Sequence, residues 1–262
     1  MLVAAVVAAA LAAPGEQAHR VATSIARDGP RPAAGARERR AQMRLGRRFE
    51  RAGLRVRVQR FSTPRGRSRN VIGIRPGERR CLRVLMAHAD TVPPSPGAED
   101  NASGLGLLAA LAPRLDALRP PCTVWLVATG AEERIHTGSP DHLGALALRE
   151  IVPRRRLRYA LSLDEVGRGR AFRLRSPAAA PRRGVERELL AAARRTGVGV
   201  DWLRDDGTGN SDHREFELAG MPAVKFGSLD NPCRHVACDT PDRLQRRAFA
   251  RVQRVVEDVL RR

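Results

Sequence analysis

The sequence predicts a single-domain, three-layer α/β/α fold in which helices cover both faces of a mixed, mostly parallel sheet. Nearly continuous apolar runs, typical of strands buried on both faces, alternate with segments of helical periodicity. Neither an internal repeat nor a linker to a second domain interrupts the 262 residues, a length within the range of one α/β domain. The apolar content of 42% suffices for a sizeable core, and the aromatic content of 3% indicates a core built mainly of Ala, Val and Leu.

The chain begins with an apolar segment, residues 1–13, which ends in small residues. This pattern is typical of the apolar part of a secretory signal with an A-x-A-like cleavage site at 10–12, although the usual basic residues before it are missing. A buried N-terminal helix is the alternative interpretation. With the signal interpretation, the folded domain comprises residues 16–262 and the protein is secreted.

The first elements of the domain are predicted to be two helices and two strands. Helical segments are expected over 16–27 and 36–52, and the second helix ends before Gly53, a residue suited to the position after a helix. Leu54, Val56 and Val58 alternate with polar residues, which predicts a half-buried strand. Another short strand is expected over 70–74. Because of their alternating pattern, both strands are placed at an antiparallel edge of the sheet.

The rest of the sheet is predicted from four apolar runs, and helical segments separate them. The runs are residues 81–87, 123–128, 159–163 and 222–226. The helices are expected over 103–118, 141–150, 185–196 and 240–262. In the last of these, Thr240 is expected as the N-cap and Pro241 as the first helical residue.

The net charge is +20, from 48 Lys and Arg against 28 Asp and Glu. Such a balance is typical of proteins that bind nucleic acid. Here, however, every basic residue except Lys225 is an Arg, and these Arg residues are scattered along the chain, as the codon usage of a GC-rich genome would produce. Nucleic acid is therefore not expected as a partner. Stable membrane insertion is not expected either, because no apolar run reaches the roughly 18 residues that a spanning helix needs.

Acidic and imidazole residues follow the carboxyl ends of the predicted strands, where ligands gather in open α/β sheets. Taken singly, each is more often a hydrogen-bonded histidine, a surface carboxylate or a helix cap than a functional group. Together they predict a metal site, because they come from different segments and meet at one edge. The residues are His88, Asp90, Asp100, Glu132, Glu133, Asp164 and His235.

Two zinc ions fit this set of side chains. Zinc binds imidazole and carboxylate groups, and catalytic sites keep one position open for water. The four positive charges of two ions would be balanced by Asp100, Glu133, Asp164 and a bridging hydroxide, with the histidines neutral. Such a balance is required of a buried site.

Six stretches resemble, in order, motifs of the co-catalytic zinc aminopeptidases of the M28 type, especially the small secreted bacterial leucine-type enzymes. The resemblance covers about residues 18–260 and implies the phosphorylase/hydrolase-like fold of zinc exopeptidases. The stretches are HAD (88–90), SPGAEDNASG (95–104), GAEE (130–133), SLDEVG (162–167), NSDHREF (210–216) and CRHVACDTPD (233–242).

The resemblance implies a role for each candidate residue. His88 and Asp164 would hold one zinc, Glu133 and His235 the other, and Asp100 would bridge both. Glu132 would be the general base and later the acid, and Asp90 a carboxylate that fixes the His88 imidazole. The resemblance also implies a cis peptide bond between Asp100 and Asn101 and a disulfide between Cys233 and Cys238.

The activity implied by the resemblance is hydrolysis of N-terminal residues from peptides with a free N-terminus, by a monomer whose two zinc ions bind a hydroxide. A glutaminyl-cyclase-like acyltransferase with one zinc, or another zinc hydrolase on the same fold, is the alternative. Amidohydrolase relatives usually insert a further domain between the last two ligands, and the segment between Asp164 and His235 is too short for one. An Arg-rich binding protein on an inactive hydrolase fold is disfavoured by the intact Glu132 and the five ligands.

Several residues lie outside this pattern. Arg234 stands where the secreted relatives often have a Tyr that stabilises the tetrahedral intermediate; it could donate hydrogen bonds there or face solvent. Cys81 and Cys122 are expected to be core thiols, with no pairing assigned. His213 is expected to be structural or to face the substrate. His19, His136 and His142 are expected at the surface.

Overall fold

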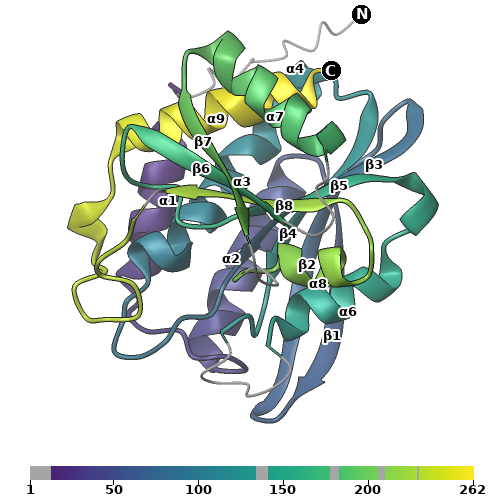
Figure 1. Ribbon diagram of the computed structural model, residues 1–262. Helices are drawn as coiled ribbons and strands as arrows, with labels where there is room; N and C mark the ends of the chain where they lie inside the picture. The colour runs from purple at the N-terminus through teal and green to yellow at the C-terminus, as the bar shows by residue number, and fades with distance from the viewer. Residues whose placement is uncertain (1–12, 134–140, 178–182, 206–209, 229) are drawn as a thin grey trace, which may run out of the picture.

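The computed structural model describes residues 13–133, 141–177, 183–205, 210–228 and 230–262. Residues 1–12 of the signal-like segment and His136 therefore lie outside the described residues. The described chain forms one sheet with the strand order β1-β2-β4-β3-β5-β8-β6-β7 (Figure 1). Parallel and antiparallel pairs occur in the same sheet and helices lie on both of its faces, so the predicted mixed α/β/α fold is confirmed.

The N-terminal region supplies two helices and the antiparallel edge of the sheet. Helices α1 (Glu16–Ala26) and α2 (Ala36–Arg51) are followed by strands β1 (Arg55–Thr63) and β2 (Gly66–Arg75). The two strands form an antiparallel hairpin, and β2 also pairs antiparallel with β4. Both helices and the edge position of the hairpin agree with the sequence prediction.

The centre of the sheet consists of four neighbouring parallel strands. They are β3 (Arg79–His88), β4 (Cys122–Thr129), β5 (Leu157–Leu163) and β8 (Ala223–Ser228), in the order β4-β3-β5-β8. Each overlaps one of the four apolar runs. The register places His88 beside Thr129 and Leu163 beside Phe226, so the carboxyl ends of these strands lie at one edge. This edge carries the candidate site.

Strands β6 (Ala171–Pro177) and β7 (Gly199–Asp205), which were not predicted from the sequence, extend the sheet beyond β8. Strand β6 pairs antiparallel with β8 and parallel with the outermost strand β7. Arginines interrupt the apolar residues of β6, and the exposed side chains Trp202 and Leu203 belong to β7. These strands lack the continuous apolar run of a strand buried on both faces, which explains why they were missed.

Among the remaining helices, those predicted over 103–118, 141–150 and 240–262 are shorter in the structure, the one predicted over 185–196 begins two residues earlier, and the helix over 213–218 was not predicted. The expected helix over 103–118 divides into α3 (Ser103–Leu111), a 3₁₀ turn containing Pro113, and α4 (Leu115–Leu118). The other helices are α6 (Leu143–Ile151), α7 (Arg183–Thr196), α8 (His213–Leu218) and α9 (Arg246–Leu260).

The prediction that the last helix begins at Thr240 is wrong. Pro241–Arg243 form a 3₁₀ turn, and the chain is extended at Leu244 and Gln245 before α9 begins at Arg246. The backbone N–H of Gln245 donates to the Gly167 carbonyl at 2.8 Å, and Leu244 is buried. This tertiary anchoring holds the segment in an extended conformation that local propensity does not reveal.

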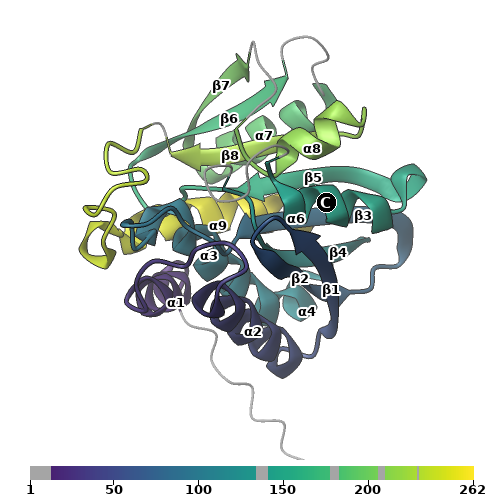
Figure 2. The ribbon, with the colours of Figure 1, turned by 90° about the horizontal axis from the view of Figure 1, so that it is seen from below.

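The helices complete three layers (Figure 2). Residues of α1, α2, α3, α7 and α9 pack with alternate strand residues such as Leu85 and Leu126 in one core. Residues of α6 and α8 pack with the intervening residues, such as Val84 and Trp125, on the opposite face. No helix in the described part of the chain combines the length and the apolar character needed to cross a membrane.

The starts of β3 and β4 are joined by a disulfide between Cys81 and Cys122. The expectation that these residues are core thiols is therefore wrong. Parallel pairing of the two strands brings the cysteines together, with their Cα atoms 4.8 Å apart. The order and neighbours of the strands decide this pairing, and the sequence alone did not give them.

Candidate metal centre

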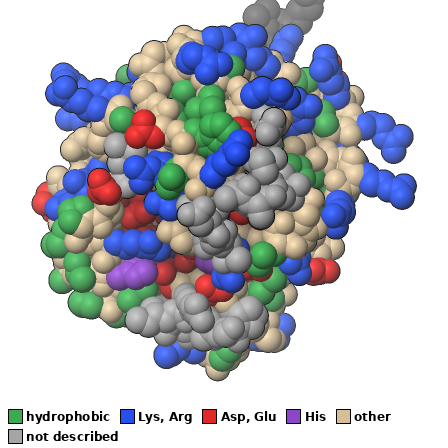
Figure 3. Space-filling view, in the orientation of Figure 1, with side chains coloured by type: hydrophobic (Ala, Val, Ile, Leu, Met, Phe, Trp, Pro, Cys, Tyr) green, Lys and Arg blue, Asp and Glu red, His purple; other side chains and the backbone are tan. Residues whose placement is uncertain are grey.

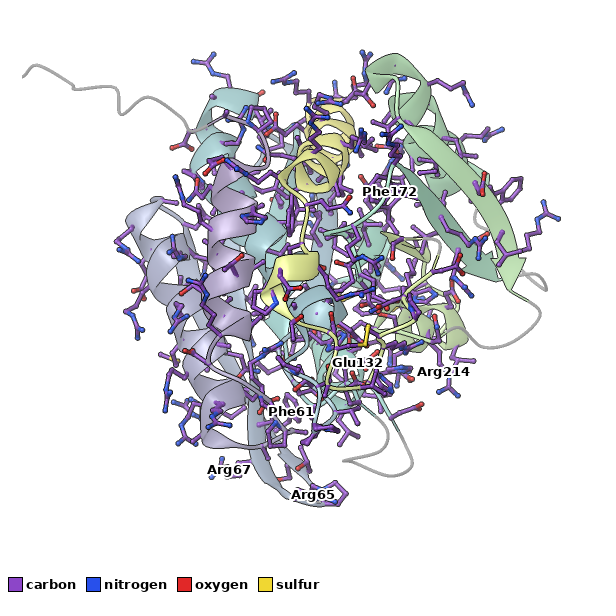
Figure 4. All side chains as sticks on the ribbon, turned by 90° about the vertical axis from the view of Figure 1, so that its left-hand side faces the viewer. Phe61, Arg65, Arg67, Glu132, Phe172 and Arg214 are labelled. Carbon is purple, nitrogen blue, oxygen red and sulfur yellow. A yellow bond between two sulfur atoms is a disulfide. The ribbon has the colours of Figure 1, made fainter. Side chains whose placement is uncertain are left out.

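The candidate site lies where the central parallel strands end. His88 is the last residue of β3, Glu132 and Glu133 follow β4, and Asp164 follows β5 directly. All four residues are buried. Figure 4 shows Glu132 in the interior among side chains of several elements, in contrast to Arg65 and Arg67 at the tip of the β1–β2 hairpin. The convergence predicted from the sequence is therefore present in the structure.

Asp100 lies between the two histidines of the site. Its Oδ1 atom is 3.1 Å from His88 Nε2, and its Oδ2 atom is 3.2 Å from His235 Nε2. The peptide bond between Asp100 and Asn101 is cis, as predicted. One carboxylate thus faces both sides of the centre.

Two groups of possible ligands share Asp100. In the strand triplet (His88, Asp100 and Asp164), Asp164 Oδ1 lies 3.5 Å from His88 Nε2. In the loop triplet (Asp100, Glu133 and His235), Glu133 Oε2 lies 3.1 Å from His235 Nε2. The five residues expected to be ligands are therefore divided between two adjacent positions. Glu132 belongs to neither of these triplets, although with His88 and Glu133 it forms a further group whose donor atoms lie close together.

The donor atoms of both triplets fit a divalent cation. Among the donor atoms of the triplets, Asp100 Oδ2, Asp164 Oδ1 and His235 Nε2 are buried and have no hydrogen-bond partner in the described part of the chain. Buried polar atoms are normally paired, so such a group points to a missing partner. Imidazole nitrogens and carboxylate oxygens are also the donor set that zinc binds.

Two further carboxylates fix the backbone of the site. Asp90 accepts hydrogen bonds from the backbone N–H groups of Glu132 and Glu133, both at 3.0 Å. In the same way, Asp239 accepts hydrogen bonds from the N–H groups of Glu99 (2.9 Å) and Asp100 (3.0 Å). Each pair of bonds holds two successive residues, one of which belongs to a triplet.

Asp90 was expected to orient His88 through its carboxylate, and the structure gives it a different contact. The Asp90 carboxylate is 3.8 Å from His88 Nδ1, while the Asp90 backbone carbonyl is 3.2 Å away. The carbonyl is thus the nearer acceptor for the imidazole N–H. Asp239 was not singled out from the sequence, although it belongs to the quoted stretch 233–242.

Glu132 is held in a mostly acidic environment. Burial, with added repulsion from Glu133 and Asp164 and opposed by His88, raises the pKa of Glu132 well above its usual range. Burial and the neighbouring Asp100 likewise raise the pKa of Glu133 to about 7. Crowded carboxylates of this kind would be relieved by a bound cation.

His142 was expected at the surface and is instead buried beside Glu132. Its Nε2 atom is 3.5 Å from Glu132 Oε1, and its Nδ1 atom is 3.1 Å from Glu215 Oε1 on α8. The His142 backbone N–H also donates to the Glu132 carbonyl at 3.0 Å. His142 stands in a left-handed conformation (φ 52°) just before α6. Its position depends on the packing of α6 and α8, which the sequence pattern did not give.

Two cations border the triplets. The Lys225 ammonium is 2.8 Å from Asp164 Oδ2, and the Arg234 Nε atom is 3.4 Å from Asp100 Oδ2. Lys225 was not singled out as a site residue. The sequence did contain a signal for Lys225, since it is the single charge inside the apolar run 222–226. A lysine is rarely buried without a partner, so its position indicates a nearby carboxylate.

His235 lies on a loop closed by the predicted disulfide between Cys233 and Cys238. Its side chain is 34% exposed, and its backbone is in the left-handed region (φ 62°). Figure 3 shows histidine and acidic side chains gathered on this face of the molecule, with basic side chains beside them. The loop triplet is therefore the side of the centre that solvent reaches.

The other two described histidines lie outside both triplets. His213, at the start of α8, is completely buried, and neither ring nitrogen has a hydrogen-bond partner among the described residues. Burial lowers the pKa of His213 to about 3, so the ring is neutral. His19 is half-buried and contacts the edge of Phe249.

Comparison with known proteins gives one family and several similar folds. The family model described as peptidase family M28 matches residues 70–260. Aminopeptidase YwaD of Bacillus subtilis (strain 168) is 29% identical over 165 residues, which are 61% of this chain and 35% of that protein. The match thus spans about a third of the relative's length.

Two solved structures illustrate the similarity in fold. BSAP, a zinc aminopeptidase from Bacillus subtilis, superimposes with a TM-score of 0.83 at 16% identity, covering 95% of this chain and 94% of the other. Fimbriiglobus ruber glutaminyl cyclase gives a TM-score of 0.81 at 20% identity, covering 94% of each chain. Because the family model matches well over half of the sequence, this chain belongs to peptidase family M28.

Proposed function

We propose that this chain is a zinc-dependent aminopeptidase that removes N-terminal residues from peptides. The observation that carries the proposal is the position of Asp100, which belongs to two ligand triplets, while Glu132 lies outside these two triplets. Such an arrangement separates the groups that bind metal from the group that moves a proton.

Each triplet would hold one zinc ion. His88 and Asp164 would bind the first, Glu133 and His235 the second, and Asp100 would bridge them. Bound zinc lowers the pKa of water and polarises a carbonyl oxygen. The triplets supply three carboxylates and two imidazoles, and the carboxylates offset most of the charge of two such ions.

Glu132 is the proposed proton carrier. Its carboxylate takes a proton from the attacking water and gives it to the amine that leaves the broken peptide bond. The Asp90 carboxylate holds the Glu132 backbone, and His142 lies beside the Glu132 side chain. These contacts keep the Glu132 carboxylate facing the site while the neighbouring Glu133 faces His235.

The surroundings of the site support the rest of the proposal. Arg234 is 36% exposed at the edge of the loop triplet, where its guanidinium can donate to the oxygen of a developing oxyanion. Two disulfides in the described chain are typical of an oxidising compartment. We therefore place the enzyme outside the cell, as a monomeric catalytic domain (16–262) that follows a signal segment (1–13).

A glutaminyl-cyclase-like reaction is the second candidate. It is supported by the similarity in fold to the Fimbriiglobus ruber enzyme, which is nearly as great as the similarity to BSAP. In that reaction the N-terminal glutamine of a peptide would cyclise and release ammonia, and no peptide bond would break.

Both candidates can be tested with one panel of substrates. Aminoacyl anilides with different first residues, the same compounds with N-acetyl groups, and peptides that begin with Gln are incubated with the zinc-loaded protein. An aminopeptidase releases the aniline only from compounds with a free amino terminus. It also cleaves peptides whose C-terminus is blocked. Release of ammonia from Gln peptides without cleavage supports the cyclase, and cleavage of the acetylated compounds contradicts both.

A further inference from the structure

Lys225 is a buried cation inside the proposed metal centre. It lies in the central strand β8 and is 4% exposed. Its ammonium is 2.8 Å from Asp164 Oδ2 and 3.6 Å from Glu165 Oε2. Lys225 is the only lysine in the sequence, and its ammonium lies next to a proposed zinc ligand.

The contact divides the Asp164 carboxylate into two unlike oxygens. Oδ2 accepts the ammonium of Lys225, whereas Oδ1 faces His88 and has no hydrogen-bond partner among the described residues. Oδ1 is the oxygen that the ammonium leaves open for a cation. Part of the negative charge of Asp164 is already neutralised by Lys225.

Arg234, the cation beside the loop triplet, should repel a bound metal ion less than Lys225 does. Arg234 approaches Asp100 Oδ2 at 3.4 Å, and its side chain is 36% exposed, against 5% for Lys225. Water and salt screen charges at an exposed position, and a buried charge is screened much less. Lys225 is also fixed on a sheet strand, whereas Arg234 stands on a loop.

From this difference we infer that Lys225 makes the two proposed metal positions unequal, so that the strand triplet binds zinc more weakly than the loop triplet. This inference rests on the proposed two-zinc function and assigns Lys225 a regulating role within it. At limiting zinc, the loop triplet fills first. Protein that holds a single zinc ion then carries it in the loop triplet.

The test is a zinc titration of chelator-stripped protein, followed by calorimetry or by competition with a chromophoric chelator. The wild type is expected to bind one equivalent tightly and a second at least about tenfold more weakly. The variant Lys225→Met has a side chain of similar length without charge. We expect it to tighten the second step by about 10–100-fold, because removing a cation in direct contact restores the negative charge that Asp164 offers to a metal ion.

Matched variants separate charge from packing. Lys225→Gln removes the charge and keeps a hydrogen-bond donor, so it should also tighten the second step; it serves as well if Lys225→Met does not fold. The control Arg83→Met removes another buried cation of the sheet, paired with Glu188 at 2.7 Å, and should leave both steps unchanged. Each reading is a binding constant, so loss of activity alone cannot imitate the effect.

The outcomes distinguish the two proposals. Two steps of equal affinity in the wild type overturn the role of Lys225 and leave the two-zinc site intact. The role is likewise overturned if the Lys225 variants keep the wild-type inequality or bind the second ion more weakly. Absence of zinc binding in every variant contradicts the proposed function itself. A single step in the wild type that becomes two in Lys225→Met supports the inference.

Discussion

The two triplets of the centre are built in different ways. His88 and Asp164 stand at the ends of two adjacent buried strands and are 1% and 2% exposed. His235 stands on a disulfide-closed loop, and its side chain is 34% exposed. His88 and Asp164 are therefore placed when the sheet forms, whereas the loop triplet also requires the 233–238 loop to be held in place.

The comparison shows that one site can combine a preformed part and an adjustable part. The rigid strands carry the triplet with the buried lysine, and the loop carries the triplet that solvent reaches. Asp100 joins the two, because Asp239 fixes its backbone and its two oxygens face opposite histidines. Substitutions that affect one triplet, both or neither can therefore test the arrangement.

The largest effect is expected from the carboxylate that belongs to neither triplet. Glu132→Gln keeps the size of the side chain and removes the proton acceptor, so kcat should fall by about 10²–10⁴. Zinc content, measured by atomic emission, should stay at the wild-type value. The matched change at the adjacent residue, Glu133→Gln, should release zinc from the loop triplet. If Glu132→Gln loses metal and Glu133→Gln retains it, the two roles are reversed.

Removal of the shared ligand should affect both triplets together. Asp100→Ala deletes the one carboxylate that faces both histidines, so both zinc ions should dissociate during dialysis against a mild chelator. Asp90→Ala is the comparison, because Asp90 contacts the backbone of Glu132 and Glu133 and would weaken zinc by about 10–100-fold. Full zinc occupancy in Asp100→Ala would refute the bridging role.

Removal of each disulfide should affect a different property, either the stability of the fold or the affinity for zinc. By the loop-closure relation, the Cys81–Cys122 bond, with a separation of 41 residues, stabilises the fold by about 4 kcal/mol, and the Cys233–Cys238 bond, with a separation of 5, by about 2 kcal/mol. Replacing Cys81 and Cys122 by Ser should lower the unfolding temperature more and leave zinc affinity unchanged.

Replacing Cys233 and Cys238 by Ser should affect zinc affinity more than stability. The loss of stability should be the smaller one, while zinc affinity of the loop triplet falls because His235 is no longer held. Denaturant unfolding and zinc titration of both double variants measure the two effects. Equal zinc affinities in the two variants would show that the disulfide does not position His235.

The smallest effect is expected at His142. The variant His142→Asn removes the imidazole beside Glu132, and Asn tolerates the left-handed backbone of this position. A contact of this kind contributes about 0.5–1.5 kcal/mol, which corresponds to roughly a 2–10-fold decrease in kcat. Zinc titration should give wild-type constants. A change in zinc affinity would mean that His142 supports the triplets and not Glu132.

The central sheet and the convergence of the site were predictable from the sequence. Continuous apolar runs identify parallel strands, and the residues that follow such runs meet at one edge whatever the order of the strands. His88, Glu133 and Asp164 could be identified in this way. Strands β6 and β7 could not, because their exposed and arginine-interrupted segments lack that pattern.

Contacts that depend on strand order or on helix packing were not predictable. Cys81 and Cys122 pair because β3 and β4 are neighbours. His142 reaches Glu132 because α6 packs against α8, and Lys225 reaches Asp164 because β8 lies beside β5. In each case the chemical character of the residue is visible in the sequence, and its partner is determined by the tertiary arrangement.

In the proposed centre, two metal ions share Asp100 and Glu132 binds neither of them. This arrangement is tested most directly by anomalous diffraction at the zinc edge, with crystals of the wild-type protein grown in saturating zinc. We expect two peaks, one contacted by His88 and Asp164 and one by Glu133 and His235, with Asp100 contacting both. A single peak at saturation, or a peak coordinated by Glu132, would contradict it.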